Sequence, residues 1–289
     1  MSHETEIWRL LPFSELPPAE ELAAAEAMLA GLAHAPRPGL RWYGARSLAL
    51  VLGSGQRPTE ADGPALTATG VTLHKRASGG TAVLFAPGFL MQDIALPATH
   101  PLRRDDVSES YRWLGELWAE ALAELGIPTE LVSIPAARAD TQTTDPRVRL
   151  ACFGGRSPYE LLAAGRKLVG FSQIRRRHGA LFQAGLYAHW PGRELAALLR
   201  MPQPAREAAD REALAEALAR RVVGLDELLP TPPAPDAIMA AFDRALARRH
   251  GVALTPDAWS AEELAVAAGA ASRYGPIAIP ATPAPAPTS

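Results

Sequence analysis

The sequence predicts an α+β fold with a mixed, mostly antiparallel sheet, helices packed around it and a small helical C-terminal extension. Two stretches, 40–95 and 159–187, consist of short apolar β-type runs interrupted by glycine and proline. Helical periodicity flanks these stretches instead of alternating with them, and the chain after Pro191 is predicted to be helical and is Ala-rich. With 289 residues, 48% of them apolar and 21% charged, the chain is able to bury a large core.

Two helices are predicted in the first half of the chain. The first covers 19–29, directly after Pro17 and Pro18, and the acidic residues in its first turn complement a helix N-terminus. The second runs from Ser108, a capping residue, to Gly126. Its large apolar side chains recur at helical spacing: Tyr111, Leu114, Trp118, Leu122 and Leu125. This apolar face predicts core packing rather than a cofactor site.

The predicted strands are apolar runs of β-branched and aromatic residues bounded by turn residues. They are expected at 48–52, 71–74, 81–85, 89–95, 130–134, 159–162, 167–172 and 179–187. Short turns connect most of them, which favours antiparallel pairing.

The C-terminal part of the chain is predicted to be helical at 212–220 and 235–249, with a last short helix that begins at Thr255 and Pro256. In that last helix Trp259, Leu264 and Val266 are expected to face the core. The Pro/Ala/Thr composition that follows cannot support a packed element. We therefore expect a main domain at 1–225, a helical extension at 226–275 and a disordered tail at 276–289.

Composition and charge exclude several classes of function. A net charge of −2 removes the electrostatic argument for nucleic acid as a partner. The N-terminus lacks the basic and apolar regions of a signal peptide, and no apolar run approaches the ~18 residues that cross a bilayer. One cysteine cannot form an internal disulfide, which fits a reducing compartment. The expectation is a cytoplasmic protein without a membrane partner.

The single cysteine, Cys152, lies in a Gly-rich turn ahead of a predicted strand, and Lys167 begins the next strand. A thiol and an ammonium can then face each other across a hairpin. A thiolate attacks carbonyl carbon, and a nearby cation favours the thiolate and holds a developing oxyanion, so this pair suits acyl transfer. The alternative is that the cysteine is a small buried apolar residue without chemistry.

A second candidate motif is the loop from Lys75 to Thr81, which joins two predicted strands and contains Arg76, Ser78, Gly79 and Gly80. Paired glycines let a main chain approach a ligand closely, and a guanidinium with successive amides holds carboxylate, phosphate or an oxyanion. The alternative is a hairpin turn that has no ligand.

A metal site and a dinucleotide site are not expected. The histidines His74, His178 and His189 lack paired spacing with carboxylates or a second cysteine. The glycines of 53–55 lack the third glycine and the βαβ context of a nucleotide fingerprint.

Two further charged features have a structural and a functional interpretation. Glu160 has the chemistry of a base, but a strand carboxylate is usually a solvated side chain, and we favour that interpretation. The run Arg175–Arg177 is usually a solvated turn, and its alternative role is to dock an acidic carrier domain.

Together these motifs resemble the catalytic domain shared by lipoate-protein ligases, octanoyltransferases and biotin ligases. The 76–80 stretch resembles the substrate loop of that family, 40–43 leading to 52–56 its entry strands, and 165–173 its lysine strand. The similarity covers roughly residues 8 to 225, so 1–225 is expected to be an acyltransferase or ligase-like catalytic domain. The cysteine ahead of Ser-Pro-Tyr-Glu is similar to that of octanoyltransferases that form a thiol acyl-enzyme.

The resemblance implies a role for each candidate residue. Cys152 would be the nucleophile, and Lys167 would bind and polarise the acyl carbonyl. The residues that would line the acyl pocket or its head-group end are Arg76, Ser78, Gly79 and Gly80. The sequence departs from the family pattern at Thr81, where a third glycine is usual, and at Phe85 and Ala184, where histidine is common.

The implied reaction moves a medium-chain acyl group, octanoyl, from an acyl carrier protein thioester to Cys152, and then to a lysine of a lipoyl-accepting domain. Neither a metal nor a nucleotide is required. One alternative is an ATP-dependent lipoate or related cofactor ligase, in which Cys152 is incidental. Another is an acyl-binding relative without turnover.

Overall fold

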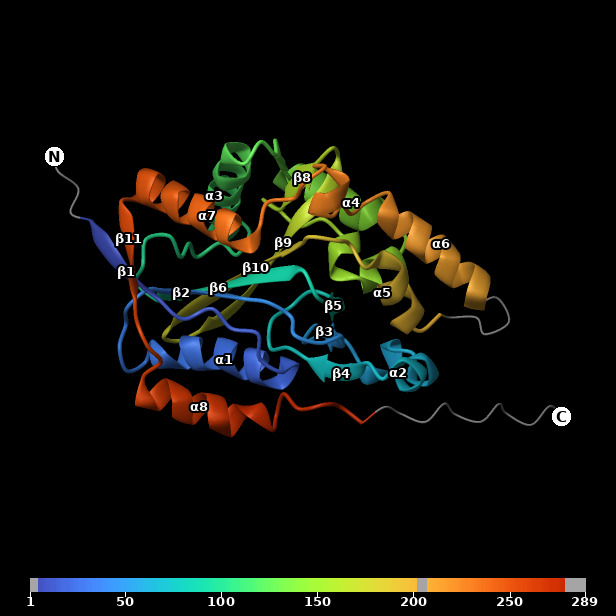
Figure 1. Ribbon diagram of the computed structural model, residues 1–289, viewed down its shortest axis with the longest axis horizontal. Coiled ribbons are helices and arrows are strands. Elements are labelled where there is room, and N and C mark those ends of the chain that lie inside the picture. Colours follow the sequence, from blue (N-terminus) through green and yellow to red (C-terminus); the bar gives the residue numbers. More distant parts are fainter. Residues whose placement is uncertain (1–4, 202–206, 279–289) are drawn as a thin grey trace.

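The computed structural model describes residues 5–201 and 207–278 (Figure 1). Its strands are β1 (Glu6–Leu10), β2 (Gly39–Tyr43), β3 (Ala49–Leu52), β4 (Thr72–Lys75), β5 (Val83–Phe85), β6 (Phe89–Pro97), β7 (Glu130–Leu131), β8 (Leu161–Ala163), β9 (Arg166–Arg176), β10 (Gly179–Tyr187) and β11 (Val252–Pro256). Its helices are α1 (Pro18–Gly31), α2 (Gly63–Thr69), α3 (Arg112–Glu124), α4 (Ile134–Thr143), α5 (Gly192–Leu198), α6 (Glu207–Ala219), α7 (Pro235–His250) and α8 (Ala261–Ala271).

The strands form two sheets. The larger has the order β11-β1-β2-β6-β10-β9-β8-β7, and the smaller has the order β4-β3-β5. In the larger sheet β1 pairs in parallel with β11 and β2, and the other neighbours pair antiparallel. The predicted α+β class with a mixed, mostly antiparallel sheet is confirmed.

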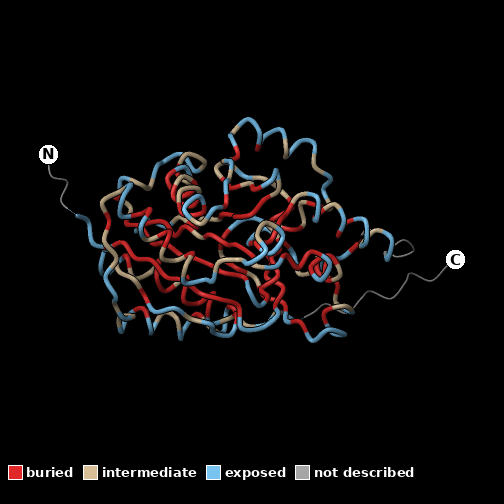
Figure 2. Tube along the Cα trace, turned by 45° about the horizontal axis from the view of Figure 1, so that its top comes forward, coloured by how far each residue is buried: buried red, intermediate tan, exposed pale blue. Residues whose placement is uncertain are grey.

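Helices cover both faces of the larger sheet. Helices α1 and α8 pack against each other on one face, and α3 and α7 on the other (Figure 1). Beneath α3 and α7, Trp42 on β2 meets Trp118 on α3 with ring centroids 5.6 Å apart. The inner strands of the sheet, such as β2, β6 and β10, are largely buried, and the exposed residues lie mainly on the outer helices, loops and edge strands (Figure 2).

Several elements differ from the sequence prediction. The run at 130–134 is a strand only as far as Leu131, because the hydroxyl of Ser133 caps α4 by accepting a hydrogen bond from the amide of Ala136 at 3.2 Å. The strand at 6–10 and the helices α2 and α4 were not predicted, whereas α5 lies in the region after Pro191 that was predicted to be helical.

The C-terminal segment is not purely helical. Thr255 and Pro256 lie in β11, which extends the sheet beside β1, and α8 begins only at Ala261, capped by Ser260. Strand β11 was missed because five residues with no helical spacing give a weak signal on their own. Leu264, expected in the core, is 55% exposed. The buried residues of α8 are Glu263 and Ala270 instead.

The first residues of the predicted disordered tail are ordered. Residues 276–278 are placed, the amide of Ile277 donates to the carbonyl oxygen of Leu73 at 2.7 Å, and the Ile277 side chain packs against the core. The rest of the predicted tail, 279–289, lies outside the described residues. Within the described ranges, none of the helices has the length and apolar character needed to cross a membrane.

Candidate active site

Cys152 lies in a 3-10 turn, Cys152–Gly154, and is partly exposed. Its amide donates to the carbonyl oxygen of Ala82 at 2.8 Å, and the amide of Ala82 donates to Leu150 at 3.0 Å. A Cβ atom at Gly154 would lie 2.0 Å from the carbonyl oxygen of Val148, so the turn requires glycine there. These contacts hold the cysteine turn beside the segment that follows β4.

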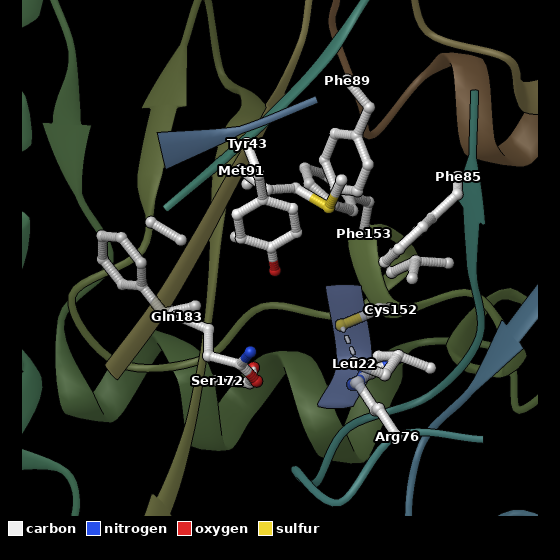
Figure 3. A pocket seen from close by; sticks show the side chains of 15 residues that line it. Leu22, Tyr43, Arg76, Phe85, Phe89, Met91, Cys152, Phe153, Ser172 and Gln183 are labelled. Carbon is white, nitrogen blue, oxygen red and sulfur yellow. Dashed lines mark hydrogen bonds between the residues drawn. The ribbon is translucent and has the colours of Figure 1, made fainter. Parts of the chain in front are cut away.

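That segment is the 76–81 loop, and Arg76 organises it. The guanidinium donates to the hydroxyl of Ser78 at 3.0 Å and to the carbonyl oxygens of Gly79 and Thr81 at 2.8 and 2.9 Å. The same side chain lies 3.9 Å from the sulfur of Cys152, a contact drawn as a dashed line in Figure 3. The loop therefore wraps a buried cation and presents it to the thiol.

The glycines of this region allow close approach of two loops. A Cβ atom at Gly53 would lie 1.9 Å from the carbonyl oxygen of Gly80, and the amide of Ser54 donates to the carbonyl oxygen of Ser78 at 3.0 Å. Gly80 has a φ of +83°, and a Cβ atom there would lie 3.2 Å from the sulfur of Cys152. The 53–55 glycines thus support the 76–81 loop.

Lys167 is fully buried at the start of β9 and makes three short contacts with oxygen. Its ammonium pairs with the carboxylate of Glu160 at 2.7 Å and donates to the carbonyl oxygens of Cys152 and Gly155 at 3.0 and 3.1 Å. The sequence predicted an ammonium facing the thiol. In the structure these contacts bind Lys167 to the main chain of the cysteine turn, and the cation at the sulfur is Arg76.

The expectation that Glu160 is a solvated side chain is wrong. Glu160 is 1% exposed, accepts hydrogen bonds from the amides of Ser157 at 2.7 Å and Phe171 at 3.0 Å, and pairs with Lys167. Burial raises the pKa of the Glu160 carboxyl above its ordinary value, although Lys167 opposes that rise. The carboxylate, directly before β8, therefore fixes the position of the Lys167 side chain on β9.

A narrow cavity of about 60 Å³ begins at Cys152 and is walled mainly by apolar side chains (Figure 3). Its apolar walls include Leu22, Val83, Phe85, Phe89, Met91 and Phe153. Tyr43 also lines it, and burial raises the pKa of the Tyr43 hydroxyl well above its ordinary value. Such a space suits an apolar chain attached at the sulfur.

A chain of buried polar groups runs beside this cavity. The hydroxyl of Ser172 contacts that of Ser78 at 3.3 Å and the Oε1 of Gln183 at 3.1 Å. The side-chain amide nitrogen of Gln183 donates to the carboxylate of Asp93 at 2.9 Å, and Asp93 pairs with the buried Arg41 at 2.7 Å. Arg41 also pairs with Glu21, 1% exposed, so this acid of the first helix belongs to the core ion cluster.

A second, more polar cavity of about 370 Å³ also has Cys152 in its wall. Gly80 and Thr81 line it on one side, and Gly155, Arg156 and Ser157 on another. It is wide enough for a substrate to reach the sulfur from a direction different from that of the narrow cavity. The two cavities meet at the thiol.

The remaining candidates have structural contacts. A nitrogen of His74 hydrogen-bonds the carbonyl oxygen of Tyr274 at 2.8 Å. Arg175 donates to the carbonyl oxygens of Asp105 and Arg104 at 2.9 and 2.7 Å. Across residues 5–201 and 207–278, no three or more histidine, cysteine or acidic side chains gather as metal ligands. The sequence patterns did not identify Tyr43 as a site residue, nor the ion cluster of Arg41, Glu21 and Asp93. The only sequence signal of that cluster was the presence of charged residues within apolar runs.

Known proteins resemble this chain in sequence and in fold. Residues 17–247 match the family described as "Lipoyl protein ligase A/B catalytic domain". The chain is 35% identical over 180 residues to the octanoyltransferase LipM of an Exiguobacterium species, covering 62% of this chain and 64% of that protein. It is 32% identical over 255 residues to the octanoyltransferase LipM of Moorella thermoacetica, covering 87% and 89%.

The fold is also similar to that of a solved structure from Thermoplasma acidophilum, a bipartite lipoate protein ligase reported with its E2 lipoyl domain. The TM-score is 0.75 at 19% identity, and the alignment covers 93% of each chain. At this identity the likeness concerns the fold alone.

Proposed function

Because the chain belongs to the lipoyl protein ligase A/B catalytic-domain family, we propose that it is an octanoyltransferase that acts through a thioester on Cys152. The donor is an octanoyl group on a carrier protein thioester, and the acceptor is a lysine of a lipoyl-accepting domain. The observation that carries the proposal is the position of the single thiol, at the junction of an apolar and a polar cavity and 3.9 Å from Arg76.

In the first half-reaction the sulfur of Cys152 attacks the carbonyl carbon of the donor thioester. The new carbon–sulfur bond forms, the old one breaks, and the carrier thiol leaves. The guanidinium of Arg76 stabilises the attacking thiolate. Lys167 exchanges one of its two main-chain acceptors for the acyl oxygen and stabilises the negative charge that develops there.

In the second half-reaction the amine of the acceptor lysine attacks the thioester on Cys152. An amide bond forms, the carbon–sulfur bond breaks, and the amine proton replaces the proton lost from the thiol. The thioester is already activated, so the proposed reaction uses neither a nucleotide nor a metal. A covalent intermediate also allows the two carriers to dock one after the other.

The narrow cavity supports an unbranched acyl chain as the transferred group. Phe85 and Ala184 lie in its wall, where the family commonly has histidine, so both positions contribute apolar surface here. The resulting pocket buries methylene groups, each worth about 0.8 kcal/mol when removed from water.

Intact-mass measurement tests the acyl-enzyme. Wild-type protein incubated with octanoyl carrier protein is expected to gain one octanoyl group, and hydroxylamine is expected to remove it. A Cys152→Ala protein is expected to gain none and to lose transfer to the lipoyl-accepting domain. Normal turnover by Cys152→Ala would exclude the thioester mechanism.

The second candidate is an ATP-dependent lipoate-protein ligase, favoured by solved fold neighbours such as lipoate-protein ligase A bound with ATP. In that case product forms only with ATP plus free lipoate or octanoate, and Cys152→Ala retains activity. An acyl-binding protein without catalysis is the third possibility, and any turnover excludes it.

A further inference from the structure

Arg149 is a cationic side chain of the polar cavity that the proposed reaction does not use. It lies in the 3-10 turn Val148–Leu150, three positions before Cys152, and lines the polar cavity. Its Nε atom is buried and makes no hydrogen bond, and within the described part of the chain its side chain has no ion-pair partner. Buried donors are nearly always satisfied in folded proteins, so the unpaired Nε of this half-buried side chain leaves Arg149 able to bind a ligand that enters the cavity.

The surroundings of Arg149 show that its position is set by the cysteine turn. A Cβ atom built on Gly155 would lie 3.9 Å from the Cγ of Arg149, so its stem runs along that glycine. The carbonyl oxygen of the same Gly155 accepts a hydrogen bond from the ammonium of Lys167 at 3.1 Å. Arg149 and Cys152 therefore line the same polar cavity, and the stem of Arg149 lies beside the residue that follows the cysteine turn.

The cavity around Arg149 favours ligands with acceptor oxygens. Arg156 lines it as well, and the one carboxylate in its wall, Asp140, already pairs with Arg221 and accepts from the amide of Arg156. The hydroxyl groups of Thr81 and Ser157 line other parts of the wall. The two guanidinium groups attract carbonyl and phosphate oxygens.

We propose that Arg149 binds an oxygen of the amide-containing pantetheine arm that presents the acyl thioester to Cys152. This inference rests on the proposed function, since it concerns the donor of the first half-reaction. The arm is a thin chain with amide carbonyls and a phosphate, and a cavity of about 370 Å³ beside the thiol accommodates part of it. Arg149 is then a binding residue for the part of the donor that does not react, and its interaction energy favours acylation.

Donors with and without the arm test the proposal. Acylation of Cys152 is followed by intact mass with octanoyl carrier protein, octanoyl-CoA and S-ethyl octanethioate, which has no amide and no phosphate. Arg149→Met is expected to lower kcat/KM for the first two donors by about tenfold to hundredfold, the effect of losing a charged hydrogen bond. The rate with S-ethyl octanethioate is expected to stay within about twofold of wild type, and Arg149→Lys is expected to recover part of the loss.

Arg147→Met is the matched control. Arg147 lies two positions earlier in the chain, pairs with Asp145 and Asp210, and does not line the polar cavity. It is expected to acylate with all three donors at the wild-type rate, and thermal melting of each variant checks that it is folded.

Three outcomes would overturn the inference. These are equal losses with all three donors, no loss with any donor, and a loss confined to transfer from preformed acyl-enzyme to the lipoyl-accepting domain. A wild-type protein that forms no acyl thioester with any donor would instead contradict the proposed function itself, and the inference with it.

Discussion

The ammonium of Lys167 lies 3.0 Å from the carbonyl oxygen of Cys152, so the lysine and the nucleophile are joined through the main chain. The same ammonium pairs with the buried carboxylate of Glu160 at 2.7 Å. Lys167 therefore has a structural role as well as its proposed role on the acyl oxygen. A substitution there changes both, and the two effects need separate measurements.

Lys167→Met is expected to lower acylation of Cys152 by roughly 100- to 1,000-fold, the usual cost of losing one oxyanion donor. It is also expected to lower the free energy of unfolding by about 3–5 kcal/mol, because Glu160 remains buried without its cation. The measurements are the single-turnover acylation rate and chemical denaturation. Lys167→Met with Glu160→Gln is the control, and it should recover stability but not rate. If the double variant regained the acylation rate, the loss in the single variant would be structural only.

Gly80→Ala is expected to slow acylation by about tenfold to hundredfold, the scale on which a small misplacement of reacting groups acts. The added methyl group would lie 3.2 Å from the sulfur of Cys152 and 3.0 Å from Arg76, at a φ of +83° that disfavours alanine. Gly55→Ala is the matched control, because a Cβ atom there has no neighbour within 4 Å. Equal acylation rates in the two variants would show that the space beside the thiol is not critical.

Removal of 276–289 is expected to lower the melting temperature by about 2–4 °C, the shift that a loss of about 1 kcal/mol causes at this size. The reason is the hydrogen bond from Ile277 to Leu73 and the packing of the Ile277 side chain. A cut after Ala278, which keeps both contacts, is the control and should melt higher than the longer cut. Removal of everything from Trp259 onward also deletes α8 and should destabilise the protein most.

Stability is expected to fall as the pH is lowered through about 6.5, the ordinary histidine pKa, in part because of His74. Burial lowers the pKa of His74, so the folded state binds fewer protons than the unfolded state at acid pH. The stability contributed by the neutral His74 ring is fully present at pH values above the pKa of the unfolded state. It is lost as the pH falls toward the lower pKa of the folded state. Melting temperatures from pH 7.5 to 5.5 test it.

His74→Gln should show a shallower dependence of melting temperature on pH than wild type. His178→Gln, which changes an exposed histidine, is the control and should keep the wild-type slope. Other histidines whose pKa burial lowers, His100 and His250, remain in both variants, so the difference isolates His74. Parallel curves for wild type and His74→Gln would contradict the assignment.

Local sequence signals predicted the elements that depend on local interactions. The strand predicted at 179–187 has those bounds in the structure, and the helix predicted at 235–249 ends at His250. Strand β1 gave too little signal because its stability comes from partners remote in sequence, Val252 to Pro256 on one side and Gly39 and Leu40 on the other.

The candidate site could be predicted as a set of residues but not as a geometry. The glycines of the 76–80 loop and of the cysteine turn indicated that both segments belong to the candidate site, and the structure brings the two into contact. The sequence predicted Lys167 at the sulfur of Cys152, whereas the structure has Arg76 at the sulfur and Lys167 on main-chain oxygens. This difference depends on how the two sheets pack, which the sequence alone does not show. The sequence does not reveal that Glu160, directly before β8, faces a buried ammonium, because a shift of one residue in the strand register reverses the face.

The parallel pairing of β1 with β11 bears on how the chain matures during synthesis. Glu6 aligns with Val252, so this strand is completed by a partner that is synthesised much later. While the ribosome is still translating, β1 has only its short contact with β2, and its other edge is open to unintended pairing. Because chain segments generally fold as they emerge, prematurely terminated products would retain the cysteine turn yet expose this edge, and they are expected to be targets for chaperones and proteases.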